Sequence, residues 1–446
     1  MKLKFRTKFF YGLGESPNVI SRVIKTLLFL YFLTDVVGLE PGFAGTVLMI
    51  GGILDAFTDP LLGILSDRTH TRWGRRRPFI LFSAIPLGLC FFLMWVPYPV
   101  ESQAMKMLFY TVPYLCYLTC ITCYHIPYIS LFPEMTDDYT ERTSITLFRQ
   151  FFASFFGLLT AVLPKMIIDS YADKALGFVV ATAPAAILVA LIPFIIFGTI
   201  KERDIDRPAK QGWASLIDAF KYAVKSRAFV TLLFLFVGSW SAVAVIESFT
   251  VYYMKYWLLN EPLMPFVFVA VVSTSILGLP MWSFLTKRIG KKKTAIIGLL
   301  MWAVPQLFYM VLTPTTPFAF VIALGALMGV GYGGAHIFSW AMFPDVMDDS
   351  EVKTGERNDG LYAGILYFIE KGAASFALFL LGVTLQISGY VPNIPQTDVT
   401  LQTIRMLMTF APLVFVLIAL TAALFFPITV ERYKEIRAEL DKKEKA

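Results

Sequence analysis

A chain of 446 residues that is 57% hydrophobic and only 16% charged exceeds what the core of a soluble protein can bury, because soluble domains hold about 45–50% apolar and about 25% charged residues. The composition therefore predicts an all-α membrane protein whose helices use the bilayer as solvent. The formal net charge of +7 does not indicate a nucleic-acid partner, since most of the 39 Lys and Arg fall in loops expected on one side of the membrane.

Apolar runs separated by charged breaks predict twelve transmembrane helices. In chain order the predicted spans lie near residues 11–36, 43–67, 77–97, 104–132, 142–168, 175–200, 228–257, 264–287, 293–313, 316–344, 358–388 and 402–427. An even number of spans places both termini on one side, and the concentration of Lys and Arg on that side predicts that it is the cytoplasm. We expect a multi-pass protein of a cell membrane, specifically a bacterial inner membrane, without a cleavable signal peptide.

The longest loop divides the predicted spans into two halves of six. We expect a first bundle over residues 1–200 that carries a cation site, a cytoplasmic linker over 201–227, and a second bundle over 228–430. The linker contains "WASLIDAFKYAVKSR", whose apolar residues repeat with helical spacing, so it predicts a short amphipathic helix on the membrane surface. Residues 431–446 form a charged cytoplasmic tail.

The two halves repeat each other. "HIPYISLFPEMTDD" at 125–138 matches "HIFSWAMFPDVMDD" at 336–349, and "DPLLGILSDRTHTRWGRRR" matches "LPMWSFLTKRIGKKK" after a short deletion. Many transporters are built from duplicated units and bind their substrate between the repeats near the bilayer midplane. The repeat therefore predicts a transporter. We do not expect an enzyme, because we find no nucleophile–base pair or metal cluster in the sequence.

Asp55 and Asp59 stand out inside the second predicted span. A charged group at the bilayer centre costs at least about 2.5–3.5 kcal/mol, so it usually serves a function. Residues four apart share one helix face, and two carboxylates there repel each other unless one is protonated or a cation lies between them. Their oxygens suit a hard cation, and Thr58 and Thr122 could add hydroxyl ligands. The alternative is that each acid pairs with a basic residue such as Lys371 for packing alone.

Further polar residues in the spans predict a substrate site. Arg149 and Lys371 are candidates for binding an anionic group or for acting as counter-ions to the aspartates. His125 either binds the substrate or a proton, or is a core histidine without a binding role. Asn18 and Trp340 complete the predicted substrate site.

At the end of the second span, Asp67, Arg68 and Arg75 predict a gating latch between helices, or simply the positive charge that orients the chain. The glycines at positions 325, 329 and 333 have GxxxG spacing, which favours close helix packing. The roles of Glu247, His336 and Glu370 stay open.

The ordered motifs "YGLGESP", "DAFTDPLLGILSDRTHTRWGRRRPF", "HIPYISL", "RQFFAS", "PDVMDD" and "EKGAASFA" together resemble the glycoside–pentoside–hexuronide:cation symporter family of the major facilitator superfamily. Its members include the melibiose permease and the sodium-dependent lysophosphatidylcholine symporter. The resemblance covers nearly the whole chain. It implies the major facilitator fold, with a cation, usually sodium, held by residues that match Asp55, Asp59, Thr58 and Thr122, and it matches Lys371 to the family lysine of span 11.

The sugar site of the family does not carry over. The two aspartates that bind galactoside in the melibiose permease align with Val19 and His125, so both acids are absent here. "TCYHIPY" and "TERTSITLFR" are more similar to the lysolipid symporter. We therefore expect either a sugar bound by other groups or a lysophospholipid-like amphiphile.

Together these observations predict a secondary active symporter that couples Na⁺ or H⁺ entry to uptake of a small organic solute by alternating access. A sensor of the same fold that binds without transporting, and a symporter of an organic anion driven by protons alone, are the alternatives. We expect a monomer in a lipid bilayer, with no cofactor and no metal beyond the coupling cation, and no nucleic-acid partner.

Overall fold

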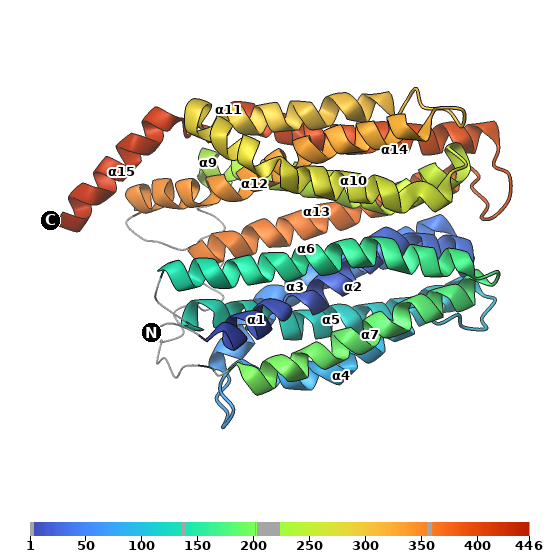
Figure 1. The fold of residues 1–446 in the computed structure, drawn as a ribbon, viewed down its shortest axis with the longest axis horizontal. Coiled ribbons are helices and arrows are strands. Elements are labelled where there is room, and N and C mark those ends of the chain that lie inside the picture. The colour runs from blue at the N-terminus through green and yellow to red at the C-terminus, as the bar shows by residue number, and fades with distance from the viewer. Residues whose placement is uncertain (1–3, 136–138, 201, 203–223, 355–358, 446) are drawn as a thin grey trace. The chain divides into compact units, whose positions relative to one another are not determined.

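The computed structural model describes the backbone of residues 4–445 except for 136–138, 201, 203–223 and 355–358. Within this part the chain is built from helices joined by short connections (Figure 1). The amphipathic helix predicted in the linker lies outside the described residues. Helices, in which the backbone groups between the two ends are paired within their own segment, are what an apolar chain needs to cross a bilayer.

The helices follow the predicted spans in order. Those of the N-terminal half are α1 (Phe5–Leu13), α2 (Ser16–Tyr31), the π-helical turn η1 (Phe32–Val36), α3 (Pro41–Arg68), α4 (Arg77–Leu93), α5 (Gln103–Met135), α6 (Tyr139–Ser170) and α7 (Lys174–Thr199). Those that follow the linker are α9 (Arg227–Tyr252), η2 (Tyr253–Trp257), η3 (Glu261–Leu263), α10 (Met264–Leu277), α11 (Leu279–Phe308), α12 (Phe318–Thr354), α13 (Asp359–Ile387), α14 (Asp398–Phe425) and α15 (Val430–Lys445).

Not every predicted span passes as a membrane-crossing helix by length and composition. Among the described residues eight helices do, and the number rises to nine if the bent pair Glu261–Leu277 and Leu279–Phe308 forms one span. The predicted loop 287–293 lies within α11, where Gly290 has φ +81° and turns the chain. Only glycine adopts this φ without strain, so the helix direction breaks there. The total of twelve stays a prediction.

The chain forms two compact units. The first contains Met1–Lys210 together with Phe379–Ile394, and the second contains Gln211–Leu378 together with Pro395–Ala446. The sequence predicts a continuous second bundle over 228–430, whereas the end of α13 packs with the first unit. The buried carboxylate of Asp35 explains this in part, because it accepts a 2.6 Å hydrogen bond from the Tyr390 hydroxyl, and its backbone carbonyl accepts from Asn393 at 2.5 Å.

The internal repeat is visible in the contacts of the matched basic segments 75–77 and 291–293, which we call the basic turns. In the first unit Arg76 donates through Nη1 to the backbone carbonyl of Ser130 in α5. In the second unit Lys291 donates through Nζ to the carbonyl of Ala341 in α12, at 2.8 Å. Both carbonyls belong to the matched "HIPYIS" and "HIFSWA" segments and follow the histidine at the same spacing.

A second pair of contacts repeats in the same way. Arg77 donates to the carbonyl of Phe197 near the end of α7, at 2.5 Å, and Lys292 donates to the carbonyl of Phe426 just after α14, at 2.8 Å. Carbonyls at the C-terminal end of a helix lack intrahelical partners. A cation there donates hydrogen bonds to them and interacts favourably with the negative end of the helix dipole. Each basic turn thus joins the last helix of its half to the helix that carries the repeated histidine.

The glycine spacing in α12 allows close packing against α10. A Cβ on Gly329 would lie 2.2 Å from the carbonyl oxygen of Val271, and one on Gly333 would lie 2.8 Å from the carbonyl oxygen of Ser275. These distances are shorter than any van der Waals contact, so a larger residue would push the two helices apart. The predicted role of these glycines in close packing is confirmed.

Candidate cation and solute site

The two aspartates of α3 meet one hydroxyl from α5. Thr122 Oγ1 lies 3.1 Å from Asp55 Oδ1 and 3.0 Å from Asp59 Oδ1. The spacing of four residues places both acids on the face of α3 that packs against α5. Thr122 is 3% exposed, whereas both aspartates are half-buried. The acids predicted to share a face therefore do so, and Thr122 lies between them.

One hydroxyl cannot satisfy both carboxylates. A threonine has a single O–H donor and two acceptor lone pairs, so at any moment Thr122 donates to only one of the two acids. The two carboxylates still share one face of α3, where a proton or a cation beside the threonine lone pairs would reduce their repulsion. Two carboxylate oxygens and a hydroxyl oxygen form a hard ligand set, which suits an alkali or alkaline-earth cation better than a soft metal.

The fourth predicted ligand has a different orientation. Thr58 donates through Oγ1 to the backbone carbonyl of Asp55 at 3.2 Å, so its hydroxyl proton is used within α3. Its oxygen lone pairs still can coordinate a cation. Across the described residues no group of three or more His, Cys, Asp or Glu is placed to hold a metal ion, so a cation at α3 would rely on the two aspartates and on hydroxyl oxygens.

The predicted substrate residues of the first unit converge on an acid that the sequence did not single out. Glu15, at the start of α2, accepts hydrogen bonds from Arg149 Nη2 at 2.5 Å and Arg149 Nε at 3.1 Å through Oε2. Its Oε1 lies 3.3 Å from His125 Nε2 and accepts from Asn18 Nδ2 at 3.4 Å. Three helices, α2, α5 and α6, thus supply one polar cluster, which we call the Glu15 cluster (Glu15, Asn18, His125 and Arg149).

Exposure separates the acid from its partners. The Glu15 side chain is 11% exposed, whereas those of His125 and Arg149 are each 24% exposed. The guanidinium of Arg149 also lies over the rings of Tyr128 and Phe132, with its carbon 5.6 and 5.9 Å from the ring centroids. Such stacking holds the planar group in one orientation. The cluster therefore has a buried anion and reachable donors.

The rule that marks Asp55 as a functional candidate applies to Glu15 as well. It lies in "YGLGESP", inside the predicted span 11–36, where any acid is costly. The missing information was its partners, because His125 and Arg149 are 110 and 134 residues away in the chain. A charged residue near a predicted helix end is easily assigned to the interface.

The other two predicted substrate residues belong to the second unit. Trp340 on α12 packs edge to face on Phe236, with ring centroids 4.9 Å apart, and lies 5.5 Å from the ring of Tyr367. Lys371 lies on α13 and is half-buried. Trp340 is thus part of an aromatic cluster of α9, α12 and α13.

The predicted gating residues are described only in part. Arg75 pairs with Glu202 at 3.5 Å, and Glu202 also accepts from the backbone N–H of Arg76 at 3.0 Å. This pair lies within the first unit, so it fastens the basic turn to the residues after α7. The side chains of Asp67 and Arg68 lie outside the described residues.

Fold and site together define a helical membrane transporter of the major facilitator superfamily. Residues 10–430 match the family described as MFS/sugar transport protein, and the chain belongs to that family. Its relatives and family are transporters, so the expectation of a non-enzyme is confirmed.

Several relatives that match over most of their length are symporters or importers by name. An uncharacterised symporter of Synechocystis sp. is 29% identical, with 98% of this chain and 97% of the relative covered. The sodium-dependent lysophosphatidylcholine symporter 1-A of Danio rerio is 27% identical over 96% of this chain and 86% of its own. A putative sulfoquinovose importer of Escherichia coli is 28% identical over 99% of this chain and 95% of its own. The predicted family is thereby confirmed.

Solved structures show the same fold. The crystal structure of the nucleoside transporter NupG superposes with a TM-score of 0.68 at 15% identity, covering 95% of this chain and 100% of that one. A bacterial homologue of the lysosomal transporter Spinster superposes with a TM-score of 0.66 at 11% identity, covering 98% and 97%. At these identities the similarity concerns the fold alone.

Proposed function

We propose that the protein is a sodium-coupled symporter whose coupling ion binds between Asp55 and Asp59. The observation that carries the proposal is the Thr122 hydroxyl, 3.1 and 3.0 Å from one oxygen of each acid, with a single proton to give. A monovalent cation in this position neutralises one of the two charges and accepts the oxygen lone pairs. Because two carboxylates on one helix face repel each other, a cation coordinated by both of them and by the Thr122 oxygen would lower that repulsion and hold α3 against α5.

The solute is proposed to bind at the Glu15 cluster. Two of the five N–H donors of Arg149 are used on Glu15, which leaves donors for a substrate. His125 and Asn18 add short-range polar contacts on the other oxygen of Glu15. A guanidinium, an imidazole and an amide suit a small hydroxyl-rich solute that carries an anionic group, such as a sugar acid. The names of the relatives, which include a sulfoquinovose importer and an isoprimeverose transporter, support a sugar-like substrate.

The coupling follows from the position of both clusters on α5. Thr122 contacts the aspartates and His125 contacts Glu15, so an ion that fixes α5 against α3 also fixes one side of the solute site. The solute then binds more tightly with the ion than without it, which is the thermodynamic requirement for symport. A membrane potential of about 100 mV supplies about 2.3 kcal/mol per charge, or roughly fifty-fold accumulation per sodium ion. Rocking of the halves would release both inward.

Uptake into proteoliposomes tests the coupling site. We expect sodium-stimulated uptake in the native protein and its loss in Asp59→Asn. The control is Asp173→Asn, which removes an exposed acid that caps α7, and which keeps sodium stimulation. Equal stimulation of the Asp59→Asn protein by sodium would show that the coupling ion binds elsewhere. If a pH gradient drives uptake in the absence of sodium, the coupling ion is the proton, bound at the same acids.

Thermal unfolding identifies the solute class. Sugars, sugar acids, organic anions and lysophospholipids are added to the purified protein with and without sodium, and a ligand raises the unfolding temperature according to its concentration and affinity. We expect the largest shift from a sugar acid, and a larger shift in sodium than in potassium. A lysophospholipid as the best ligand would instead favour the activity named for the Danio rerio relative.

A further inference from the structure

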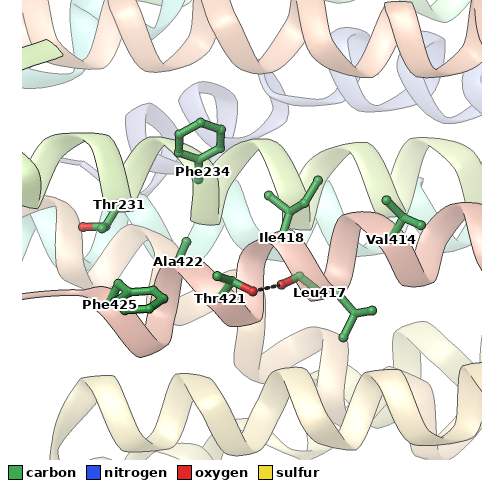
Figure 2. A pocket seen from close by; sticks show the side chains of 8 residues that line it. All are labelled: Thr231, Phe234, Val414, Leu417, Ile418, Thr421, Ala422 and Phe425. Carbon is green, nitrogen blue, oxygen red and sulfur yellow. Dashed lines mark hydrogen bonds between the residues drawn. The ribbon is translucent and has the colours of Figure 1, made fainter.

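An apolar groove lies on the second unit between α9 and α14. Its volume is about 500 Å³, and eight side chains line it (Figure 2): Thr231, Phe234, Val414, Leu417, Ile418, Thr421, Ala422 and Phe425. The two threonines do not make it polar. Thr231 donates to the carbonyl of Arg227 and Thr421 to the carbonyl of Leu417, each at 2.8 Å. Hydroxyls satisfied within their own helices leave the groove with no free donor from its lining.

The length of the groove along α14 is close to the thickness of one bilayer leaflet. From Val414 to Phe425 α14 rises about 16 Å, at about 1.5 Å per residue, which is close to half of the roughly 30 Å hydrocarbon thickness. Its side chains face outward, since Phe234 is 50%, Val414 53% and Phe425 59% exposed. Phe425 is the last residue of one membrane-crossing helix, and Arg227 is the first of the other. One end of the groove therefore lies where both helices leave the membrane.

Two cations lie at that end. Arg227 is exposed and begins α9, one helical turn before Thr231. Lys292 donates at 2.8 Å to the carbonyl of Phe426, the neighbour of Phe425. Arg227 at the start of α9 and Lys292 beside Phe426 thus place two positive charges at the same end of the groove. A headgroup with a net negative charge would interact more favourably with them than one without net charge.

We propose that the groove binds one acyl chain of an anionic phospholipid, whose phosphate interacts with Arg227 and Lys292. The apolar lining supplies the site for the chain, and the leaflet-length depth places the headgroup at the interface. Basic residues at a membrane surface favour anionic lipids. Because the lipid joins α9 to α14 along their exposed seam, it stabilises the packing of the second unit. This site is independent of the solute and cation sites of the first unit.

Native mass spectrometry of delipidated protein in detergent tests the proposal. Dioleoyl phosphatidylglycerol and dioleoyl phosphatidylcholine are titrated separately, and bound lipids are counted. We expect one tightly bound phosphatidylglycerol, retained at least tenfold better than phosphatidylcholine. Arg227→Gln with Lys292→Gln should weaken retention of phosphatidylglycerol by roughly thirty-fold. Lys287→Gln with Lys293→Gln removes the same charge from exposed positions and should leave retention within about twofold.

A pair of leucine substitutions tests the chain groove separately from the headgroup. Leu417→Trp fills the groove, whereas Leu300→Trp changes a similarly exposed leucine of α11 outside it, the two being 46% and 44% exposed. Only Leu417→Trp should lose the bound lipid. On the unmodified protein, phosphatidylglycerol with a photoreactive acyl chain should crosslink within residues 414–425 or 231–234. The proposal would be overturned if both lipids were retained equally, if the paired variants had equal effects, or if crosslinks formed elsewhere. A dimer in light scattering that Leu417→Trp converts to a monomer would also overturn it, because a second copy would then cover the groove.

Discussion

The hydroxyl of Thr122 lies 3.0 Å from Oδ1 of Asp59, across the interface between α5 and α3. The same hydroxyl reaches Asp55 at 3.1 Å. A side chain with one proton therefore organises two acids from another helix. The contact joins residues 63 positions apart in the chain, so it ties the proposed ion site to the packing of two helices.

Removing the Thr122 hydroxyl should weaken sodium binding. Thr122→Val keeps the shape of the side chain but removes a hydrogen bond to a charged group, which is worth about 1.5–3 kcal/mol. We expect the sodium concentration for half-maximal uptake to rise by roughly tenfold to a hundredfold, with Thr122→Ser close to the native protein. Thr119→Val is the control, because Thr119 donates only to the carbonyl of Leu115 in its own helix. Sodium activation that is unchanged in Thr122→Val would remove this hydroxyl from the ion site.

Breaking the Glu15 cluster should destabilise the first unit. Glu15→Gln leaves the guanidinium of Arg149 without its carboxylate, and removing one partner of a fully buried ion pair costs about 3–5 kcal/mol. Because the Arg149 side chain is 24% exposed, we expect a smaller loss of roughly 1–3 kcal/mol, seen as a lower unfolding temperature in detergent.

A double variant separates the ion pair from a general effect on folding. Glu15→Gln combined with Arg149→Gln should recover part of the lost stability, because no unpaired charge remains. Glu101→Gln, in an exposed loop, should unfold at the native temperature. If the double variant is less stable than the sum of the two single variants predicts, the charge pairing is not what stabilises the cluster.

Gly329→Ala should separate α12 from α10. The added methyl would lie 2.2 Å from the carbonyl oxygen of Val271, and a backbone atom cannot yield by rotating a side chain. Overpacking of this kind costs about 1–3 kcal/mol. Gly364→Ala is a matched substitution, since among the described residues no packing neighbour comes within 4 Å of the position its methyl would take, and alanine favours the helix. Thermal unfolding should show a lower temperature for the first variant and an equal or higher one for the second.

The C-terminal helix should be held to α12 by charge. Arg437 on α15 lies 3.0 Å from Asp348, whose side chain is fully buried, and Arg432 lies 3.8 Å from Asp349. Arg437→Ala should speed hydrogen exchange of the α15 amides by about threefold to tenfold, as expected when a partly exposed pair is lost. Lys434→Ala removes an exposed charge of the same helix and should leave exchange unchanged. Exchange that responds equally to both variants would show that α15 is held by its apolar residues alone.

The sequence predicts features that depend on spacing within one segment better than contacts between residues that are far apart in the chain. The Asp55–Asp59 face, the glycine packing of α12 and the family could be predicted, because each depends on periodicity or on ordered motifs within one segment. The pairing of Glu15 with His125 and that of Asp35 with Tyr390 could not, since these partners lie more than a hundred residues away in the chain. The break at Gly290 lies inside the predicted connection between the spans 264–287 and 293–313, so its position could be predicted, whereas its φ of +81° is known only from the structure. Thr58 is a third case, because the sequence predicts it as a cation ligand and the structure shows its hydroxyl proton donated within its own helix.

The hydrogen bonds of the two basic turns are a feature that both halves of the chain share, whereas the acids of α3 are not. Arg76 on Ser130 and Lys291 on Ala341 hold equivalent helix positions with different side chains. In the middle of the repeat, Asp59 in one half corresponds to Leu279 in the other. The proposed ion chemistry at Asp59 is therefore confined to one half, whereas a contact between a basic residue and this helix carbonyl occurs in both halves. Selectivity in such a chain can evolve in one half without rebuilding the other.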